Sequence, residues 1–232
     1  MNEKWVAITK SAVYASRYKD GFGEEHTTIM NDGGLLTMVV RDVQFQGNDF
    51  DMFEPKDVSD TSRLSSFKFL HGRLCFCVIE GDIPVPVETP SGIVNGLLTF
   101  ELKLEGPLPT GQMNDKQLKL RLAVNEQTFS SQGKTGHFDG EMLDLQNQLP
   151  DGTFMKVCFN CAFSDYSPYG HSLFGTMICF RANKTGYLAL SIKEEDFKDH
   201  YFDVMDTVSE IVQETYLCPE FERRVPGTGY RG

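Results

Sequence analysis

The sequence predicts an α+β protein in which a β-rich, sandwich-like N-terminal half packs with an α+β C-terminal half. Apolar and polar side chains alternate with a period of two over residues 98–104 and 118–124, as expected for strands that bury one face. In the second half, apolar residues recur with helical spacing over residues 194–217, which predicts one long amphipathic helix. We therefore divide the chain into a β-rich region, residues 1–130, and an α+β region, residues 131–232.

Further strands are expected beside turn-forming residues in the N-terminal half. Residues 34–47 and 73–81 are apolar segments with the pattern of strands, and the Asn-Asp-Gly-Gly stretch at residues 31–34 has the composition of a tight turn. Residues 81–92 hold three prolines, and proline has no backbone N–H to donate to a neighbouring strand. We therefore expect this segment to form an edge strand or a loop.

Two helices are expected in the C-terminal half. Asp139 can cap a short helix over residues 141–148, and Pro150 then ends it. Ser191 and Glu194 have the spacing of a capping box, whose side chains satisfy free N–H groups at the start of the long helix. Both helices therefore have recognisable start signals.

Three strands are expected between the two helices. Residues 153–163 and 174–181 are rich in apolar residues and bracket a turn of Ser, Asp, Pro and Gly, and residues 186–192 form the third candidate strand. The composition of the turn accounts for its structure, because Pro168 fixes its own φ and Gly170 allows a positive φ. The first two strands are therefore expected to form a hairpin.

The charge of the chain restricts its partners. It carries 22 basic and 33 acidic residues, a formal charge of −11, and a phosphate backbone would repel so acidic a chain. No stretch of about eighteen apolar residues is present, and the N-terminus lacks the apolar segment of a signal peptide. We therefore expect a cytoplasmic protein that binds neither nucleic acid nor membrane, whose six cysteines are thiols or metal ligands rather than disulfides.

Four of the cysteines form the candidate metal site. Cys158 and Cys161 have C-x2-C spacing, Cys179 follows after seventeen residues, and Cys218 lies beyond the long helix. Two thiolates at this spacing can reach one tetrahedral ion, so the four are candidate ligands of a structural zinc ion, with His171 as an alternative fourth ligand. In the other interpretation, the four are small apolar side chains packed in the core. A redox pair is disfavoured because the flanking residues indicate a strand rather than a helix N-terminus.

The turn of the hairpin is the candidate interaction surface, since exposed aromatic and charged side chains are typical of recognition surfaces. The polar C-terminal end of the chain could dock beside it. The predicted interaction residues are Asp165, Tyr166, Tyr169, His171, Tyr230 and Arg231. His171 and Asp165 could also form a general base with its orienting carboxylate, but the sequence marks no nucleophile. No residue is assigned a catalytic role.

Two segments, residues 138–181 and residues 212–232, resemble a family of bacterial proteins of unknown function. The first contains the C-x2-C pair and the Ser-Asp-Tyr-Ser-Pro-Tyr-Gly turn, and the second contains Cys-Pro-Glu-Phe and Gly-Thr-Gly-Tyr-Arg-Gly. The resemblance covers roughly residues 129–232. It implies a bacterial intracellular protein and supports treating the four cysteines as one group, but it implies no reaction.

The function that these observations predict is non-enzymatic binding, with another protein as the partner. An acidic chain of this size suits a toxin-neutralising, immunity-type role, in which acidic groups cover a basic active site. The alternative is a metal-dependent hydrolase that uses the cysteine group with His171 and Asp165 beside an open coordination position. A third possibility is a structural module of a larger assembly, which would expose a large apolar patch.

Overall fold

The architecture is strand-rich, as the sequence predicts. The computed structural model describes residues 11–32, 35–56, 58, 61–106, 116–167, 170–171, 173–190, 202–226 and 228. Its largest element is an antiparallel sheet of ten strands. These strands are β1 Ala12–Asp20, β2 Gly23–Asn31, β3 Leu36–Val40, β4 Val43–Gly47, β5 Glu54–Pro55, β8 Cys77–Thr89, β9 Gly92–Leu104, β10 Gln117–Val124, β11 Gln127–Ser130 and β12 Phe154–Met155.

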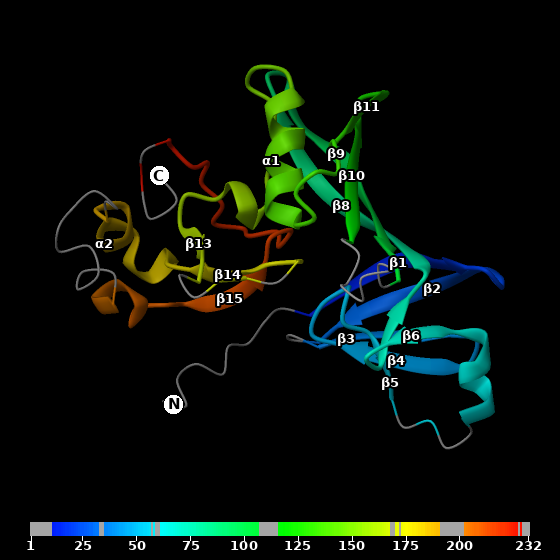
Figure 1. Ribbon diagram of the computed structural model, residues 1–232. Helices are drawn as coiled ribbons and strands as arrows, with labels where there is room; N and C mark the ends of the chain where they lie inside the picture. Colours follow the sequence, from blue (N-terminus) through cyan, green and yellow to red (C-terminus); the bar gives the residue numbers. More distant parts are fainter. Residues whose placement is uncertain are drawn as a thin grey trace.

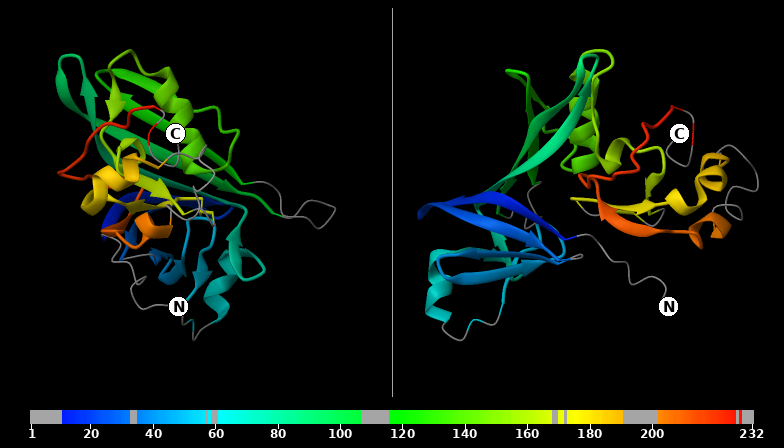
Figure 2. Two further views of the ribbon diagram at one scale, coloured as in Figure 1. Left: turned by 90° about the vertical axis from the view of Figure 1, so that its left-hand side faces the viewer. Right: turned by 180° about the vertical axis from the view of Figure 1, so that it is seen from behind.

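The strands of this sheet lie in the order β11–β10–β9–β8–β1–β2–β3–β4–β5, and β12 pairs with the end of β8. The long strands β8, β9 and β10 run past the helix α1 (Phe138–Gln148), while β1 to β5 turn away from them, so the sheet is strongly bent (Figures 1 and 2). The expected two-sheet sandwich is therefore replaced by one continuous sheet. Because β8 pairs with both β9 and β1, the two halves of this sheet remain hydrogen-bonded to each other.

The alternating segments form the centre of the sheet. Leu98 and Phe100 on β9 and Leu120 and Leu122 on β10 are fully buried, and the register places Leu120 opposite Phe100 and Leu122 opposite Leu98. Side chains on the same face of paired strands touch, so these residues form one continuous apolar layer. The strands predicted over residues 98–104 and 118–124 are confirmed.

Residues 81–89 of the proline-containing segment, which was expected to form an edge strand or a loop, belong to β8, so the loop alternative is wrong. Pro84 and Pro86 pair with Leu97 and Asn95 of β9. On the other side of β8, the ladder to β1 ends at the pair Asp82–Ala15. The prolines therefore lie beyond the ladder to β1, where no backbone N–H of β8 has to donate a hydrogen bond to β1. A strand can accommodate proline at such positions.

The other described elements are a second, smaller sheet of three strands, a two-stranded hairpin formed by β6 and β7, and short helices. They are η2 Thr61–Ser66, β6 Lys68–Leu70, β7 Arg73–Cys75, η3 Cys158–Asn160, β13 Ser164–Tyr166, β14 Thr176–Cys179, η4 Arg181–Asn183, α2 Lys184–Leu188 and β15 Glu210–Gln213. A sheet of order β13–β14–β15 lies beside the large one (Figure 1). β13 and β14 form a hairpin, but β13 lies in the segment predicted as the turn, while the predicted first strand, residues 153–163, forms β12 and η3.

Two predictions for the C-terminal half are wrong. The expected strand over residues 186–192 is the helix α2 as far as Leu188, because the Asn183 side chain accepts a hydrogen bond from Gly186 N and caps it. The long helix predicted over residues 194–217 does not continue to its expected end, since β15 pairs with β14. Residues 202–205 are helical, and residues 194–201 lie outside the described part. Apolar residues such as Val212 are buried in a sheet instead of on a helix face.

Helix α1 forms where the short helix was predicted, with a different cap. Its N-cap is His137, whose side chain makes no capping bond, and Asp139 lies in the first turn. A carboxylate there still interacts favourably with the positive end of the helix dipole. The helix packs its buried Met142 and Leu145 into the same hydrophobic core as the large sheet.

One core joins the two regions of the chain. Its members include Phe50 and Phe100 from the N-terminal region and Phe138, Phe174 and Val212 from the C-terminal region. A second, smaller cluster around Phe180 and Tyr187 lies within the C-terminal region. The question whether the two halves have separate cores is therefore answered by a shared one.

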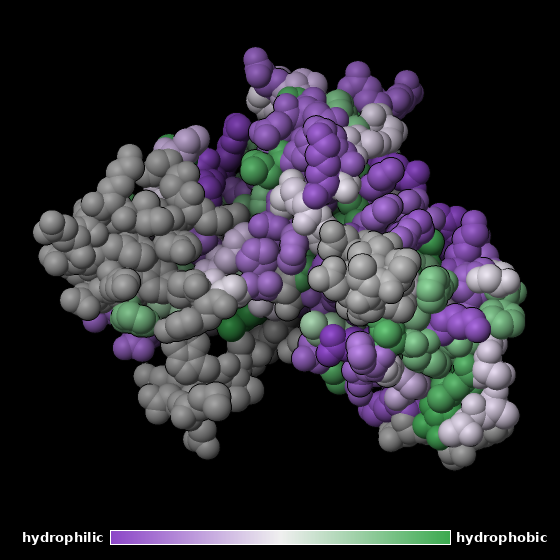
Figure 3. Space-filling model, viewed as in Figure 1, coloured by the Kyte–Doolittle hydropathy of each residue, from purple (hydrophilic) through white to green (hydrophobic). Residues whose placement is uncertain are grey.

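The surface is mainly polar around α1. In the view of Figure 3, the coloured residues around α1 are mainly hydrophilic, and the visible hydrophobic residues gather over the part of the sheet formed by β3 to β5. Within the described residues, no helix combines the length and apolarity needed to span a membrane.

The close approach of β8 to β9 makes Gly81 a test of the packing. A Cβ atom at this position would overlap the ring of Phe100 and lie 3.1 Å from Ser16 Oγ. Overpacking a core of this kind costs about 1–3 kcal/mol, so Gly81→Ala is expected to lower the free energy of unfolding by that amount in urea titrations. Gly21→Ala is the matched control, because no atom lies within 4 Å of its added Cβ. Equal stability of the two variants would contradict this packing.

Candidate functional site

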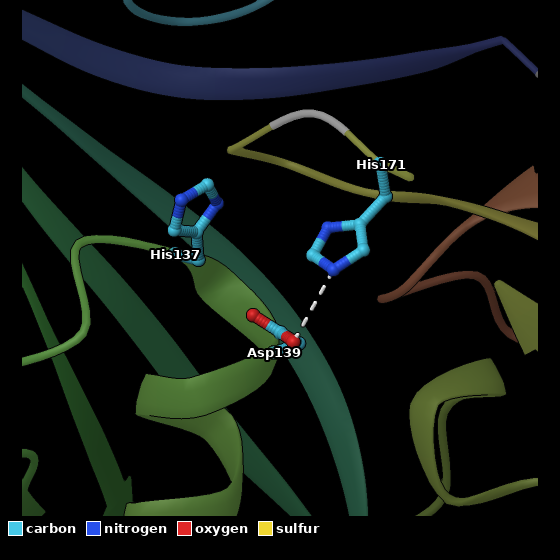
Figure 4. A group of neighbouring side chains, drawn as sticks. All are labelled: His137, Asp139 and His171. Carbon is cyan, nitrogen blue, oxygen red and sulfur yellow. Dashed lines mark ion pairs between the residues drawn. The ribbon is translucent and has the colours of Figure 1, made fainter. Parts of the chain in front are cut away.

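Two histidines and one aspartate converge at the start of α1. His137 is the N-cap residue, Asp139 lies in the first turn, and His171 comes from the loop between β13 and β14. One ligand atom from each lies within 4.8 Å of the others, and His171 Nε2 is 3.4 Å from Asp139 Oδ2 (Figure 4). Two ligand atoms bound at 2.0–2.1 Å to one tetrahedral ion would lie about 3.3 Å apart. The observed distance between His171 and Asp139 matches that separation.

One nitrogen of His137 has no partner within the described residues. His137 Nδ1 is buried and makes no hydrogen bond, and an imidazole nitrogen is a common metal ligand. The rings of His137 and His171 lie with centroids 5.8 Å apart at 82°. The side chains of His171 and Asp139 are 24% and 32% exposed, so the group is open to solvent on one side.

The loop that carries His171 is fixed by backbone hydrogen bonds. Phe138 N donates to Leu173 O over 2.9 Å, which ties the start of α1 to this loop. The buried carboxylate of Asp49, in the connection between β4 and β5, accepts from Leu173 N at 2.5 Å and from Phe174 N at 3.1 Å. The N-terminal region thus positions a loop of the C-terminal region beside His137 and Asp139.

A buried acid lies behind His171. The ring of Tyr166 packs on His171 with centroids 4.4 Å apart, and its hydroxyl donates to Glu214 Oε1. Gly175 N donates to the other oxygen of Glu214 over 2.9 Å. Burial raises the pKa of Glu214 well above its ordinary value, and the charge of Asp139 raises it further. Perturbed carboxyl groups beside a cluster of ligands are typical of functional sites.

Asp49 is the second carboxyl group with a raised pKa. Burial and the neighbouring charge of Asp51 raise the pKa of Asp49 to about 6. Hydrogen bonds from three backbone N–H groups favour its charged form and partly oppose this rise. The side chain is 2% exposed. A carboxyl group of this kind changes its charge near neutral pH while it holds the loop of His171.

The structure separates His171 from the carboxylate that the sequence suggested for it. Asp165 and Tyr166 are neighbours on β13, and neighbouring side chains of a strand point to opposite faces. Tyr166 packs on His171, whereas Asp165 accepts a hydrogen bond from Tyr187 Oη at 2.6 Å. The carboxylate that pairs with His171 is Asp139.

The predicted interaction surface is corrected in the same way. Asp165 is fully buried and Tyr166 is 7% exposed. The reason is that β13 pairs with β14 and is covered by the C-terminal segment, so it is not an exposed turn. His171 remains at the surface. Tyr169, Tyr230 and Arg231 lie outside the described residues.

The four candidate zinc ligands lie in one neighbourhood. Burial raises the pKa of the Cys158 thiol, and the charges of Cys161, Cys179 and Cys218 raise it further. Burial likewise raises the pKa of Cys179 to about 11, with smaller contributions from Cys161 and Cys218. The other two thiols, Cys75 and Cys77, lie at β7 and β8. The structure thus brings together the four cysteines that the sequence grouped.

The local structure around the C-x2-C pair differs from the expected strand. Cys161 N donates to Cys158 O over 3.0 Å and closes the 3-10 turn η3. Among the described residues, the ligand atoms of His137, Asp139 and His171 alone lie within 4.8 Å of one another as a group of three. No three of the four thiol sulfur atoms lie this close together, so they are not arranged as the ligands of one tetrahedral ion.

Fold and site together define a strand-rich α+β protein with a two-histidine, one-carboxylate group at the start of α1. The chain belongs to a family of unknown function (DUF6304), whose model matches residues 12–164. No curated protein matches the chain. No solved structure matches it either.

The family match supports membership of an uncharacterised family. It covers mainly the N-terminal part of the chain, whereas the sequence resemblance covers the C-terminal part. The resemblance rests on residues 129–232, so the two overlap over residues 129–164. The match includes His137 and Asp139 and ends before His171 and Glu214. The candidate site is thus built from residues on both sides of the end of the match.

Sequence reasoning missed two of the three residues in this group. The His-Phe-Asp order at residues 137–139 places two ligand types at a helix start, which was a visible signal. Asp139 instead was interpreted as a helix cap. The approach of His171 depends on the hydrogen bond from Phe138 N to Leu173 O, and no local pattern indicates this bond.

Proposed function

We propose that the protein binds one divalent transition-metal ion through His137, Asp139 and His171, and binds its ligand at that ion. The observation that carries this proposal is the convergence of three ligand atoms within 4.8 Å from a helix start and a hydrogen-bonded loop. Two histidines and one carboxylate form a known ligand set for zinc and for ferrous iron, and both kinds of site leave coordination positions open.

The open side of the group supports a role in ligand binding rather than in stability alone. Structural zinc sites are closed by four protein ligands, whereas sites with three protein ligands keep a position for water or substrate. Partial exposure of the side chains of His171 and Asp139 gives a ligand access from solvent. The ring of Tyr166 supports His171 from behind, so that its orientation is held before an ion binds.

Removal of a ligand tests the proposal. Isothermal titration of the purified chain with Co²⁺ is expected to show a binding event at this site that His171→Ala and Asp139→Ala each weaken by more than about 100-fold, since even indirect supporting residues contribute 10–100-fold. Any binding at the cysteines should stay unchanged in both variants. His26→Ala is the matched control, because His26 is exposed on β2 and belongs to no ligand group. Unchanged binding in both site variants would refute the metal site.

A metal-dependent hydrolase is the second candidate, favoured by the three-residue ligand set. In this version the ligands are His137, Asp139 and His171, and the pairing of His171 with Asp165 is not retained. A bound divalent ion lowers the pKa of its water and so supplies a nucleophile near neutral pH. Zinc-loaded protein should then hydrolyse an activated ester or phosphodiester, and His171→Ala should abolish turnover. A loaded protein without turnover would favour binding alone.

The toxin-neutralising role and a protein partner remain predictions from the acidic composition. They are compatible with the metal site, because a metal-bound surface can also contact a protein. A pull-down with basic bacterial nucleases as probes would test the role directly: retention of a nuclease on the immobilised chain, with loss of its activity, is the expected result.

A further inference from the structure

We propose that Cys158, Cys161, Cys179 and Cys218 form a second metal site, a structural zinc site that holds the C-terminal segment against η3. The site is distinct from the histidine group, shares no residue with it and does not depend on the proposed function. Its ligands would all be thiolates, which select zinc among abundant divalent ions.

The first step in the argument is the backbone of the C-x2-C pair. Cys161 N donates to Cys158 O in the turn η3, so the two cysteines lie at the ends of one tight turn. Tight turns with this spacing are the usual way in which a zinc knuckle supplies two of its four ligands.

The second step is that the segment carrying Cys218 is bound directly to this turn. Cys158 N donates to Tyr216 O over 3.0 Å, and Phe159 N donates to Glu214 O over 2.9 Å. Beyond Cys218, Ala162 N donates to Glu222 O over 2.7 Å. The chain from residue 214 to residue 222 therefore follows η3 and places Cys218 beside the C-x2-C pair.

The third step is the position of Cys179 at the end of β14. Its register partner on β13 is Ser164, and Phe180 N donates to Phe163 O over 2.7 Å. Since Phe163 is two residues from Cys161, the end of β14 adjoins the same turn. Three segments that are far apart in the sequence thus meet with one or two thiols each.

Two basic side chains lie near the thiols and would offset part of the negative charge of a zinc-loaded site. Four thiolates and one Zn²⁺ carry a net charge of −2, which nearby cations would offset. Arg181 Nη1 donates to Cys218 Sγ over 3.8 Å, and Lys184 interacts electrostatically with Cys161. Arg181 also pairs with Glu210 at 2.7 Å, and Lys184 with Glu222 at 2.7 Å, so each cation interacts with an acid as well as with a thiol.

Binding of the ion requires the four sulfur atoms to come closer together than they are in the structure. In a tetrahedral site with Zn–S distances near 2.3 Å, neighbouring sulfur atoms lie about 3.8 Å apart. The thiols do not have this arrangement in the described residues, but the backbone positions are set by the hydrogen bonds above. The sulfur atoms would therefore have to move together on binding, and cysteine side chains can move by changing between staggered rotamers.

Cobalt spectroscopy tests this site separately from the histidine group. The double variant His137→Ala, His171→Ala is loaded with Co²⁺, so that only the thiol site remains. One Co²⁺ per chain with a sulfur-to-cobalt charge-transfer band in the near ultraviolet is expected, because nitrogen and oxygen ligands do not give that band. The band should be lost in Cys161→Ser and in Cys218→Ser, and Cys75→Ala, which removes a buried thiol elsewhere, should leave it unchanged.

The unmutated chain gives an independent readout if a serine variant does not fold. In the folded metal-loaded protein, four thiols should be protected from a thiol reagent and should become reactive when a chelator removes the ion. A double variant that binds no cobalt, together with thiol reactivity that a chelator does not change, would overturn the proposal. A Cys158–Cys161 disulfide in protein purified without reductant would also overturn it. Neither result would affect the test of the histidine group.

Discussion

Replacement of Phe50 by alanine is expected to lower the free energy of unfolding by about 3–5 kcal/mol, the usual cost of deleting a buried phenylalanine ring. Phe50 is fully buried, and its ring contacts those of Tyr14, Phe100, Phe138 and Phe174 at centroid distances from 4.6 to 6.2 Å. The surrounding rings belong to both regions of the chain. The cavity would therefore weaken the core that joins them.

The same substitution should weaken metal binding although it removes no ligand. Phe138 lies between His137 and Asp139, and Phe174 lies in the loop of His171. Loss of Phe50 loosens the support of both, and residues that orient metal ligands contribute about 10–100-fold to affinity. Urea unfolding and cobalt titration of Phe50→Ala measure the two effects.

Phe22→Ala is the control for Phe50→Ala. Its side chain is largely exposed, and its ring makes a cation–π contact with the guanidinium of Arg41, which lies 5.7 Å from the ring centroid. Loss of such a cation–π contact costs about 0.5–1 kcal/mol at an exposed site, and the metal affinity should stay unchanged. A Phe50→Ala variant as stable as Phe22→Ala would contradict the shared core.

The second large effect is a pH dependence of stability that comes from Asp49. Its pKa rises from 3.8 to about 6 in the folded protein, mainly because of burial. Between these values the folded state retains a proton that the unfolded chain has lost, so the stability from this group is fully present below about pH 4 and falls as pH rises towards 6. A shift of about two pKa units corresponds to about 3 kcal/mol.

Asp49→Asn isolates this contribution. The amide is neutral at every pH and keeps one oxygen to accept a hydrogen bond from Leu173 N or Phe174 N. The unfolding free energy of the variant minus that of the native chain should therefore increase by about 3 kcal/mol between pH 4 and pH 7. Glu214 also has a raised pKa, to which the charge of Asp49 contributes, so the same comparison is made in a Glu214→Gln background, where this coupling is absent. A difference that does not change with pH would show that Asp49 titrates normally.

The sequence predicted local structure well where one face of a strand is buried. The alternation of apolar and polar residues over 118–124, which includes Leu120 and Leu122, predicted a strand because its apolar side chains all face the core. It could not show whether the strands form one sheet or two, since that depends on the pairing of β8 with β1. The register between strands distant in the sequence is set by the whole core.

The errors in the C-terminal half have the same origin. The apolar residues over 208–217 fit a helix stripe by spacing, but pairing of β15 with β14 satisfies the backbone in another way and still buries Val212. Tertiary pairing thus overrides a helical pattern. Conversely, the side chain of Asn183 caps α2, and the strand predicted over residues 186–192 did not take this helix-start signal into account.

The candidate site was only partly visible from the sequence. Spacing grouped Cys158 with Cys161, and the structure places Cys179 and Cys218 nearby. The histidine group depends on hydrogen bonds between distant segments, above all those from Leu173 N and Phe174 N to Asp49. Such contacts have no signature at short range, which explains why Asp165 and not Asp139 was assigned to His171.

The most direct test of the metal site is an anomalous difference map from crystals grown with Zn²⁺ and measured at the zinc absorption edge. We expect a peak bonded to one nitrogen each of His137 and His171 and to an oxygen of Asp139, at about 2.0–2.2 Å. A well-ordered His171 loop without anomalous density beside these three side chains would contradict the proposed function.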